Sequence, residues 1–197
     1  MHMAQSQPVR QARGERRRRA ILEAALRVIS ERGVEGVTHR AVADAAGVPL
    51  SATTYYFESL DELLASALEL FVEEEVSRLE GLAVQLEGQE LPALVMARLF
   101  RAELVSEVSR AQLELYLEAA RRPSLRDIAR RSIEAYAESA AAALRAAGLS
   151  EPALDPRAFV ALFDGYGLHA AAGFDDQGLE DALMALWAAA TRAIGNR

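Results

Sequence analysis

The spacing of apolar positions along the chain predicts a molecule built of α-helices. From residue 20 to residue 32 the apolar side chains recur every three or four positions, which is the period of a helix with one buried face. The same spacing predicts further helices at about 91–108, 109–121, 124–147, 156–172 and 179–194. No segment shows the alternation of apolar and polar residues that predicts a β-strand. We therefore expect an all-α fold.

A short second helix is predicted between Thr38 and Gly47. Gly33 is expected to end the helix before it, because glycine adopts the backbone conformation that follows a helix end without strain. The Thr38 hydroxyl is suited to accept a hydrogen bond from a free backbone N–H of the first turn, and Gly47 is suited to end the segment. The expected buried residues of this helix are Ala41, Val42, Ala45 and Ala46.

A third short helix, from about Pro49 to Phe57, is expected to lie across the second one. Two short helices joined by a tight glycine turn form a helix-turn-helix, an element that places its second helix in the major groove of DNA. An ordinary helical hairpin within a core is the alternative for this segment. Ser59 is expected to cap a long fourth helix.

Basic residues are concentrated at the front of the chain, although the formal net charge is -7. Residues 1–57 hold nine arginines against five acidic residues, whereas the remaining residues hold 13 arginines against 24 acidic residues. A basic front on an acidic body favours contact between the front and a polyanion. Four consecutive arginines stand where the helix dipole disfavours cations, so we expect them to bind DNA phosphate, with a solvated charge run as the alternative. They are Arg16, Arg17, Arg18 and Arg19.

The third short helix carries hydroxyl and aromatic groups suited to contact with DNA. Tyr55, Tyr56 and Phe57 cannot all be buried on one face, because consecutive helix residues point about 100° apart. We assign Phe57 to the core and the two tyrosine hydroxyls to phosphate contact. Hydroxyls and methyls that suit base edges are carried by Ser51, Thr53 and Thr54.

The stretch "THRAVADAAGVPLSATTYYFESLDELL", which follows a helix with an arginine-rich start, resembles the DNA-binding domain of the TetR family of bacterial transcriptional regulators. The resemblance is specific over about residues 15–70 and only architectural beyond them. It implies a flexible N-terminal arm (1–14), a helix-turn-helix domain (15–58) and a larger helical domain (59–197) for ligand binding and dimerisation. Members are usually homodimeric repressors that bind a palindromic double-stranded DNA operator and leave it when a small-molecule effector binds.

Position by position, the resemblance implies a set of DNA contacts. Arg40 matches a position that can read a base, and Thr38 and His39 match positions near the DNA backbone. The start of the recognition helix corresponds to Leu50, Ser51 and Ala52, and its further contacts correspond to Thr54, Tyr55 and Tyr56. Two positions depart from the family, because Thr54 stands where a tyrosine is common and Leu60 stands where a lysine often contacts phosphate.

Aromatic residues of the second half are candidates for an apolar ligand pocket with polar tips. The expected lining consists of Phe100, Tyr116, Tyr136, Phe163, Tyr166 and His169. Core packing or a dimer interface is the alternative for each of them. By the resemblance, helices around residues 164–173 and 179–195 form the dimer interface.

The sequence offers little support for catalysis or for a metal or cofactor site. It has no cysteine, only three histidines, and no HExxH, nucleophile-elbow or Walker motif, so we expect no enzymatic activity, no metal and no cofactor. No apolar run of about 18 residues and no signal-peptide core is present, so the expected location is the cytoplasm, without membrane association. A ligand-independent regulator, an activator and a helical small-molecule-binding protein or enzyme remain open as alternatives.

Overall fold

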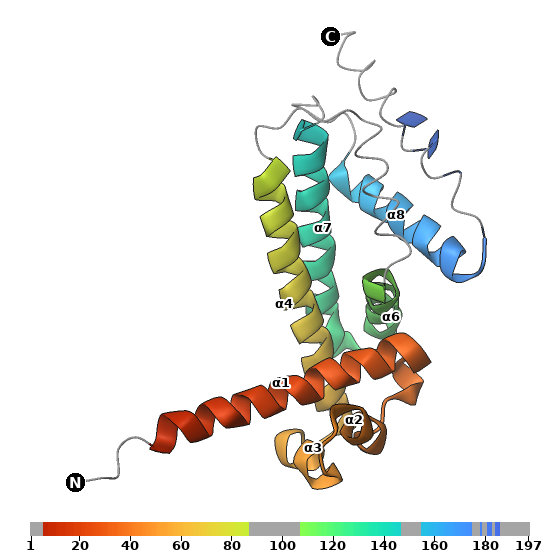
Figure 1. Cartoon of the computed structure of the whole chain (residues 1–197). Helices are drawn as coiled ribbons and strands as arrows, with labels where there is room; N and C mark the ends of the chain where they lie inside the picture. Colours follow the sequence, from red (N-terminus) through yellow and green to blue (C-terminus); the bar gives the residue numbers. More distant parts are fainter. Residues whose placement is uncertain are drawn as a thin grey trace. The chain divides into compact units, whose positions relative to one another are not determined.

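The structure is a computed structural model (Figure 1). The regular secondary structure of the residues that it describes is helical. The described residues are 6–86, 107–146, 155–174, 178, 181–182 and 184–185. No strand occurs within these ranges, so the all-α prediction is confirmed. The chain divides into two compact units, Met1–Phe71 and Val72–Arg197. The division falls inside a helix, later than the boundary after residue 58 that the sequence suggested.

The first unit begins with helix α1 (Ser6–Arg32), which starts well before Ala20, the residue at which the apolar period begins. Residues 6–19 lack a regular apolar face, but they are rich in arginine and glutamine, which favour helix. Pro8 falls in the first turn, where proline is tolerated. The predicted apolar face is confirmed, with almost no exposed surface on Ile21, Leu22, Ala25, Val28 and Ile29.

The connection from α1 to the next helix has the local features that the sequence predicts. Gly33 has a φ of 69° and is followed by the 3-10 turn η1 (Val34–Gly36). Helix α2 (His39–Ala46) then begins, and the Thr38 Oγ1 accepts a hydrogen bond of 3.0 Å from the Ala41 N–H. The predicted cap at Thr38 is therefore confirmed.

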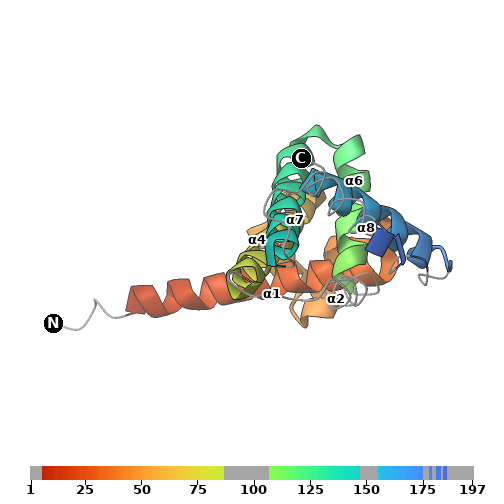
Figure 2. The same ribbon diagram turned by 90° about the horizontal axis from the view of Figure 1, so that it is seen from above.

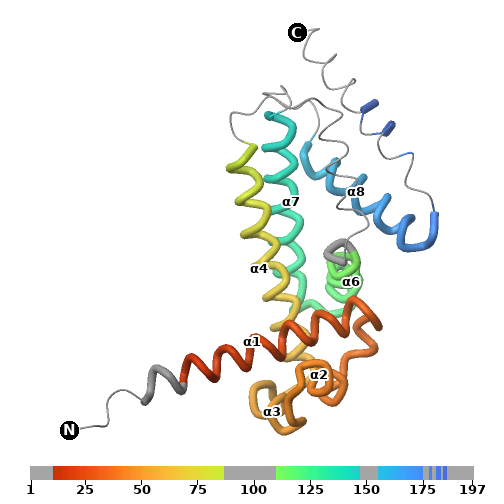
Figure 3. The backbone as a smooth tube through the Cα atoms, viewed as in Figure 1, coloured from red at the N-terminus to blue at the C-terminus, as the bar shows by residue number. Residues whose placement is uncertain are grey.

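A tight turn joins α2 to helix α3 (Leu50–Tyr56). Gly47 ends α2 with a φ of 65°, in the left-handed region that glycine enters without steric cost. Its N–H bonds back to carbonyl groups of α2, and Pro49 directly precedes α3. Figure 3 traces this turn from α2 into α3. The two short helices and their turn form the predicted helix-turn-helix.

The face that α2 turns inward agrees with the prediction at Val42 and differs from it at Ala43 and Ala45. Val42 and Ala43 are its buried residues, whereas Ala45 is exposed. The Ala45 carbonyl accepts a hydrogen bond of 3.2 Å from the Arg27 guanidinium of α1, close to the negative end of the α2 dipole. Alanine stands on several faces of this short helix, so the apolar pattern does not select one face.

Helix α4 (Leu60–Leu86) begins with the predicted cap. The Ser59 Oγ accepts a hydrogen bond of 3.1 Å from the Glu62 N–H, and the Glu62 carboxylate accepts one of 2.8 Å from the Glu58 N–H. The first turns of α4 bury Leu63, Leu64, Ala67 and Leu68. These residues belong to the core of the first unit, which is why that unit extends to Phe71.

The described part of the second unit includes the end of α4 and helices α6 (Glu107–Arg121), α7 (Arg126–Ala146) and α8 (Pro156–Ala171). The 3-10 turn η2 (Pro123–Leu125) connects α6 to α7, and α8 packs on both of them. The end of α4 lies beside α7 in Figures 1 and 2. Leu86 of α4 packs there against Ala143 and Ala146 of α7.

The helices predicted at 109–121, 124–147 and 156–172 agree with α6, α7 and α8 to within a few residues. The helices predicted at 91–108 and 179–194 lie largely outside the described residues. Asp155 caps α8 by accepting a hydrogen bond of 3.0 Å from the Arg157 N–H, and Pro156 occupies the first helical position. None of the described helices combines the length and apolar character that membrane crossing requires.

Candidate nucleic-acid interface and ligand site

Helix α3 presents most of its side chains to solvent. Leu50 is 43% exposed and Tyr55 is 80% exposed. Ser51 and Thr54 are exposed as well, and Ala52 is half-buried. Large apolar and aromatic side chains that stand in water beside polar ones are typical of a surface that a partner covers. This solvent-facing side of α3 is therefore a candidate contact surface.

Thr53 points away from this surface, so its predicted contact with a base edge is wrong. Its side chain is fully buried, and its hydroxyl donates a hydrogen bond of 2.8 Å to the Leu50 carbonyl. The same oxygen lies 3.5 Å from the His39 carbonyl at the start of α2. A threonine hydroxyl can bond back to a carbonyl of its own helix, which satisfies it without water.

The three aromatic residues at the end of α3 differ in how deeply they are buried. Phe57 is fully buried, which confirms its assignment to the core. Tyr55 is exposed and Tyr56 is half-buried, and their rings meet edge to face with centroids 5.1 Å apart. The Tyr56 hydroxyl lies beside α1, because a Cβ placed on Gly14 would be 3.7 Å from it. Tyr55 therefore has the more accessible hydroxyl.

The start of α2 adjoins α3 and carries three of the predicted DNA contacts. Arg40 is exposed. Thr38 is also exposed, although its hydroxyl oxygen already accepts the capping hydrogen bond. His39 is half-buried, and its Nδ1 is buried and has no hydrogen-bond partner among the residues that the structure describes. Arg40 is thus the exposed basic side chain of α2.

Two of the four consecutive arginines have partners within the first unit. The Arg18 guanidinium lies over the Phe57 ring, 5.1 Å from the ring centroid, and donates a hydrogen bond of 3.4 Å to the Ser66 hydroxyl. The Arg19 Nε lies 2.9 Å from a carboxylate oxygen of Glu23, one helical turn away. These contacts hold both side chains against the protein.

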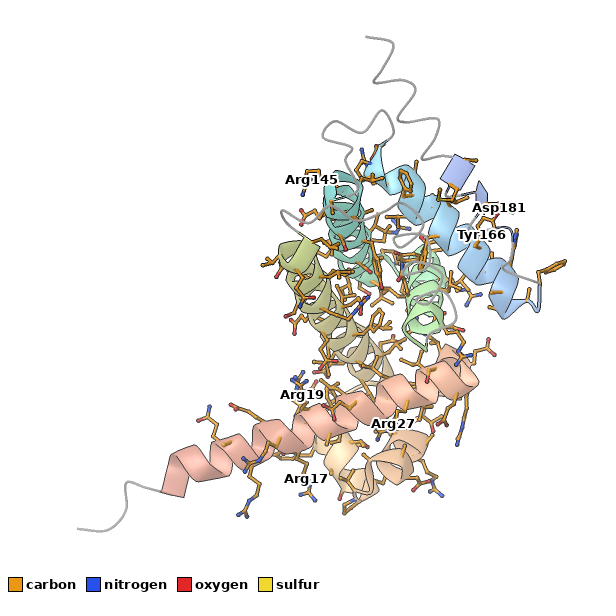
Figure 4. The ribbon with its side chains drawn as sticks, turned by 45° about the horizontal axis from the view of Figure 1, so that its top comes forward. Arg17, Arg19, Arg27, Arg145, Tyr166 and Asp181 are labelled. Atoms are coloured by element: carbon orange, nitrogen blue, oxygen red, sulfur yellow. The ribbon has the colours of Figure 1, made fainter. Side chains whose placement is uncertain are left out.

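The other two arginines face solvent. Arg16 and Arg17 are exposed, and within the described part of the chain no hydrogen bond or ion pair involves either side chain. Figure 4 shows Arg17 and Arg19 leaving α1 on opposite sides, with Arg17 on the side of α2 and α3. Arg17 and the exposed surface of α3 therefore belong to one side of the first unit.

In the second unit, Tyr116 of α6 belongs to a buried polar chain. The Gln112 Nε2 donates to the Tyr116 hydroxyl at 2.7 Å and to a carboxylate oxygen of Asp164 at 3.1 Å. Burial, and then the Asp164 carboxylate, raise the pKa of Tyr116 to about 12. Burial raises the pKa of Asp164 to about 6. Phe163 and Gly167 border the same narrow recess, which has essentially no space for a water molecule.

A second group of polar side chains joins Tyr136 of α7 to α4. Its hydroxyl donates a hydrogen bond of 2.8 Å to the Glu75 carboxylate, which also accepts one of 3.0 Å from the Arg78 guanidinium. Burial raises the pKa of Tyr136, and the Glu75 carboxylate raises it further. The Tyr116 hydroxyl adds to this effect, so the two tyrosines are neighbours.

Tyr166 and His169 do not line this recess. The Tyr166 hydroxyl, labelled in Figure 4, donates a hydrogen bond of 3.2 Å to the Gly178 carbonyl. His169 is exposed, and its ring centroid lies 6.5 Å from that of Tyr166 and 6.1 Å from that of Phe174. Phe100 lies outside the described residues. The described members of the predicted pocket set thus divide into a half-buried group and a group toward the end of α8.

The sequence reasoning did not identify Glu75, Gln112 or Asp164. The sequence offers one signal for them, which is a polar residue at a position on the apolar side of a helix. Gln112 stands four residues before Tyr116, and Glu75 stands three residues after the buried Val72. Within the described ranges, no group of three or more His, Asp or Glu side chains is arranged to hold a metal ion.

Comparisons with known proteins agree with this two-part organisation. Residues 21–67 match the family described as "Bacterial regulatory proteins, tetR family", and residues 87–189 match "Tetracyclin repressor-like, C-terminal domain". The HTH-type transcriptional regulator PksA of Bacillus subtilis (strain 168) is 46% identical over 71 residues. That stretch covers 36% of this chain and 35% of that regulator, so the match spans about a third of the curated relative.

Solved structures are similar over most of the chain. The multidrug binding protein EbrR complexed with imidazole is 33% identical, with 87% of this chain and 89% of that chain covered and a TM-score of 0.62. A TetR-family member from Streptomyces coelicolor A3 is 34% identical, with 86% and 97% covered and a TM-score of 0.63. The helix-turn-helix, the matches to both halves and these relatives lead to one conclusion: the chain belongs to the TetR family and is a DNA-binding transcriptional regulator.

Proposed function

We propose that the protein is a homodimeric repressor that binds a palindromic DNA operator and leaves it when a small-molecule effector binds to the second unit. The observation that carries the DNA-binding part is the solvent-facing side of α3, where Leu50 and Tyr55 stand exposed beside hydroxyl side chains. The exposed Arg40 lies on α2, which contacts α3. An α-helix of this kind fits the major groove of B-DNA.

Within this proposal the exposed side chains have separate roles. Arg40 reads a base, since an arginine can make two hydrogen bonds to a guanine edge. The start of α3 faces the bases with Leu50, Ser51 and Ala52, and its end contacts base and phosphate with Thr54, Tyr55 and Tyr56. Thr38 and His39 lie near the DNA backbone, and Arg16 and Arg17 bind phosphates. Arg18 and Arg19 contribute mainly positive potential, because their guanidinium groups have partners within the protein.

Dimerisation is supported by exposed apolar side chains on and just after α8. Leu168 is 54% exposed and Phe174 is 70% exposed. A second copy of the chain that packs on this surface would remove both side chains from water. Two helix-turn-helices then enter successive major grooves, with half-sites about 10 base pairs apart from centre to centre.

Effector binding is supported by the polar chain buried among the helices of the second unit. EbrR, a structural relative, has been solved in complex with imidazole, proflavin and ethidium. A ligand that binds among these helices releases DNA only if its affinity differs between the DNA-bound and the released conformation of the dimer.

The direct test is selection of fragments from genomic DNA by the purified protein, followed by binding and transcription assays on the selected fragment. We expect an inverted repeat, a complex with two protein chains, and lower transcription from a promoter that contains the fragment. A single unrepeated half-site would contradict the dimer, and increased transcription would contradict the repressor. Failure to enrich any sequence at low salt would contradict operator binding itself.

A further inference from the structure

Helix α3 has few buried side chains that could fix its orientation. It is seven residues long, and Thr53 is its buried residue. Phe57, the residue that ends the helix, has no exposed surface. A recognition helix that presents most of its side chains to solvent depends on contacts at its ends, because hydrogen bonds to base edges tolerate little change in position. The contacts around Phe57 therefore determine how firmly α3 is held.

Arg18 of α1 covers the Phe57 ring. The central carbon of its guanidinium lies 5.1 Å from the ring centroid, a distance at which a cation and an aromatic ring attract each other. The Nη2 of the same guanidinium donates a hydrogen bond of 3.4 Å to the Ser66 hydroxyl in the first turns of α4. One side chain of α1 thus contacts both the residue that ends α3 and the helix that follows it.

Arg27 makes a corresponding contact at the end of α2. Its Nη2 donates a hydrogen bond of 3.2 Å to the Ala45 carbonyl. The carbonyls of the last turn of a helix have no partner within the helix and lie at the negative end of its dipole, so a guanidinium is well suited to this place. Arg18 and Arg27, the second of which is labelled in Figure 4, thus connect α1 to the ends of both short helices.

The surroundings of these two arginines differ from what phosphate binding needs. Arg16 and Arg17 are exposed, and no hydrogen bond or ion pair of theirs lies within the described residues. Arg18 and Arg27 donate to groups of the protein, and turning outward to a phosphate would break these hydrogen bonds. The arginines of α1 therefore include side chains available to DNA and side chains engaged with α2, α3 and α4.

We propose that Arg18 and Arg27 are positioning residues for DNA recognition, which fix the ends of α3 and α2 relative to α1 without contacting DNA. Their effect is on the preference for the operator over other sequences. Base recognition needs α3 in one orientation in the major groove, whereas attraction to phosphates needs only positive charge nearby. The inference rests on the proposed function, because it concerns the way in which the helix-turn-helix reads its operator.

Three single variants separate positioning from phosphate binding. Arg18→Ala and Arg27→Ala remove the proposed contacts. Arg19→Ala is the matched control, because Arg19 carries the same charge and pairs with Glu23 of its own helix. Alanine favours helix, so α1 is expected to persist in all three variants, and melting curves check this. Affinities are measured for a selected genomic fragment and for a shuffled fragment of the same composition, each over a series of salt concentrations.

The ratio of the affinities for the two fragments is the informative quantity. In Arg18→Ala and in Arg27→Ala this ratio is expected to fall about tenfold, the size expected for the loss of a cation–π contact or of a hydrogen bond to a charged group. In Arg19→Ala the ratio should stay near that of the unmodified protein. A general loss of stability would lower both affinities by the same factor and leave the ratio unchanged. An unchanged ratio, or a salt slope lower by about 1 than in Arg19→Ala, would overturn the assignment for the arginine concerned.

Operators with single base-pair changes distinguish positioning from a direct base contact. When α3 is held less firmly, the penalties for changed base pairs are expected to shrink at several positions of the half-site. Loss of an arginine that contacts one base relaxes the preference at one base pair only. A change confined to a single base pair in Arg18→Ala would therefore overturn its positioning role.

Hydrogen exchange in the absence of DNA gives a test that does not depend on the proposed function. The Phe57 N–H at the end of α3 and the Val48 N–H after α2 each donate a hydrogen bond of 3.0 Å to a carbonyl of the preceding helix. Because the arginine contacts limit local opening, exchange is expected to be about tenfold faster at Phe57 in Arg18→Ala and at Val48 in Arg27→Ala, and unchanged at both amides in Arg19→Ala. Unchanged exchange in the first two variants would overturn the proposal. Failure of the unmodified protein to prefer any DNA fragment would bear on the proposed function alone.

Discussion

At the scale of single residues, the four consecutive arginines of α1 are chemically alike but differ in their surroundings. Arg18 lies over the Phe57 ring and Arg19 is paired with Glu23, whereas Arg16 and Arg17 are exposed and have no hydrogen-bond or ion-pair partner among the described residues. The sequence predicts a basic cluster but not this division. The division depends on which side of α1 faces the rest of the first unit, and that is settled by tertiary packing.

The difference between Arg17 and Arg19 can be measured in DNA binding. Arg17→Ala is expected to weaken binding to all sequences similarly and to reduce the slope of log affinity against log salt by about 1, because one phosphate contact is lost. Arg19→Ala is the matched control, with the same change in charge on the opposite side of α1. Its salt slope is expected to stay near that of the unmodified protein. A larger slope change in Arg19→Ala than in Arg17→Ala would contradict this division.

Arg40 is expected to act differently from the phosphate-binding arginines. Arg40→Ala should cost about 1 to 3 kcal/mol of binding free energy on the operator and should relax the preference at one base pair. The measurement is a set of affinities for operators with single base-pair changes. A loss that is uniform over all of these operators would show that Arg40 contacts the backbone instead of a base.

Asp164 is expected to make the stability of the protein depend on pH. Its carboxyl has a pKa of about 6 in the folded chain against an ordinary value of 3.8, so the folded state binds more protons between these values. Its ionisation therefore lowers stability as pH rises through this window, and the penalty is fully present above it. After allowance for partial exposure, the penalty is about 1 to 2 kcal/mol.

Denaturant unfolding of the unmodified protein and of Asp164→Asn tests this expectation. Relative to the unmodified protein, the variant should gain about 1 to 2 kcal/mol between about pH 4 and about pH 8, because asparagine does not ionise. Asp127→Asn shows whether the removal of any carboxylate has the same effect. A relative stability of Asp164→Asn that does not change with pH would contradict the burial of an ionised carboxylate.

At the scale of elements, the sequence predicts best those features that depend on interactions between residues close together in the chain. The caps at Thr38 and Ser59 and the glycine at position 47 are readable from the sequence, because each acts within one helical turn. The start of α1 was predicted too late, since the prediction relied on apolar spacing and residues 6–19 are helical without it. Thr53 was placed outward because a hydroxyl suits DNA, yet the same hydroxyl can bond within its own helix.

Two glycines have open space around them, so alanine substitutions at these positions compare the effect of backbone conformation without a change in packing. A Cβ added to Gly47 or to Gly81 would meet no atom within 4 Å, but only Gly47 has a positive φ, of 65°. Gly47→Ala is expected to lower the free energy of unfolding by about 1 kcal/mol, whereas Gly81→Ala should raise it by about 0.5 to 1 kcal/mol in the interior of α4. Thermal unfolding of both variants provides the measurement. Similar shifts in the two variants would contradict a left-handed turn at Gly47.

At the scale of the whole molecule, the sequence predicts a basic DNA-binding front and an acidic helical remainder, but it does not locate the ligand site. Tyr116, Tyr136 and Phe163 come from three helices and belong to the two groups of polar side chains or to the recess, whereas Tyr166 and His169 lie elsewhere on α8. Each of these residues fits the apolar spacing of its own helix equally well. The packing between helices determines which of these residues come together. The spacing of apolar residues within one helix carries no information about that packing.

The salt dependence of DNA affinity, measured on a selected genomic fragment and on a shuffled fragment of the same composition, tests the central claim most directly. We predict an affinity for the selected fragment that is higher by a factor of about 10³ or more, with a steep decrease as salt increases. Equal affinity for the two fragments, or no binding to either at low salt, would contradict sequence-specific DNA recognition by α2 and α3.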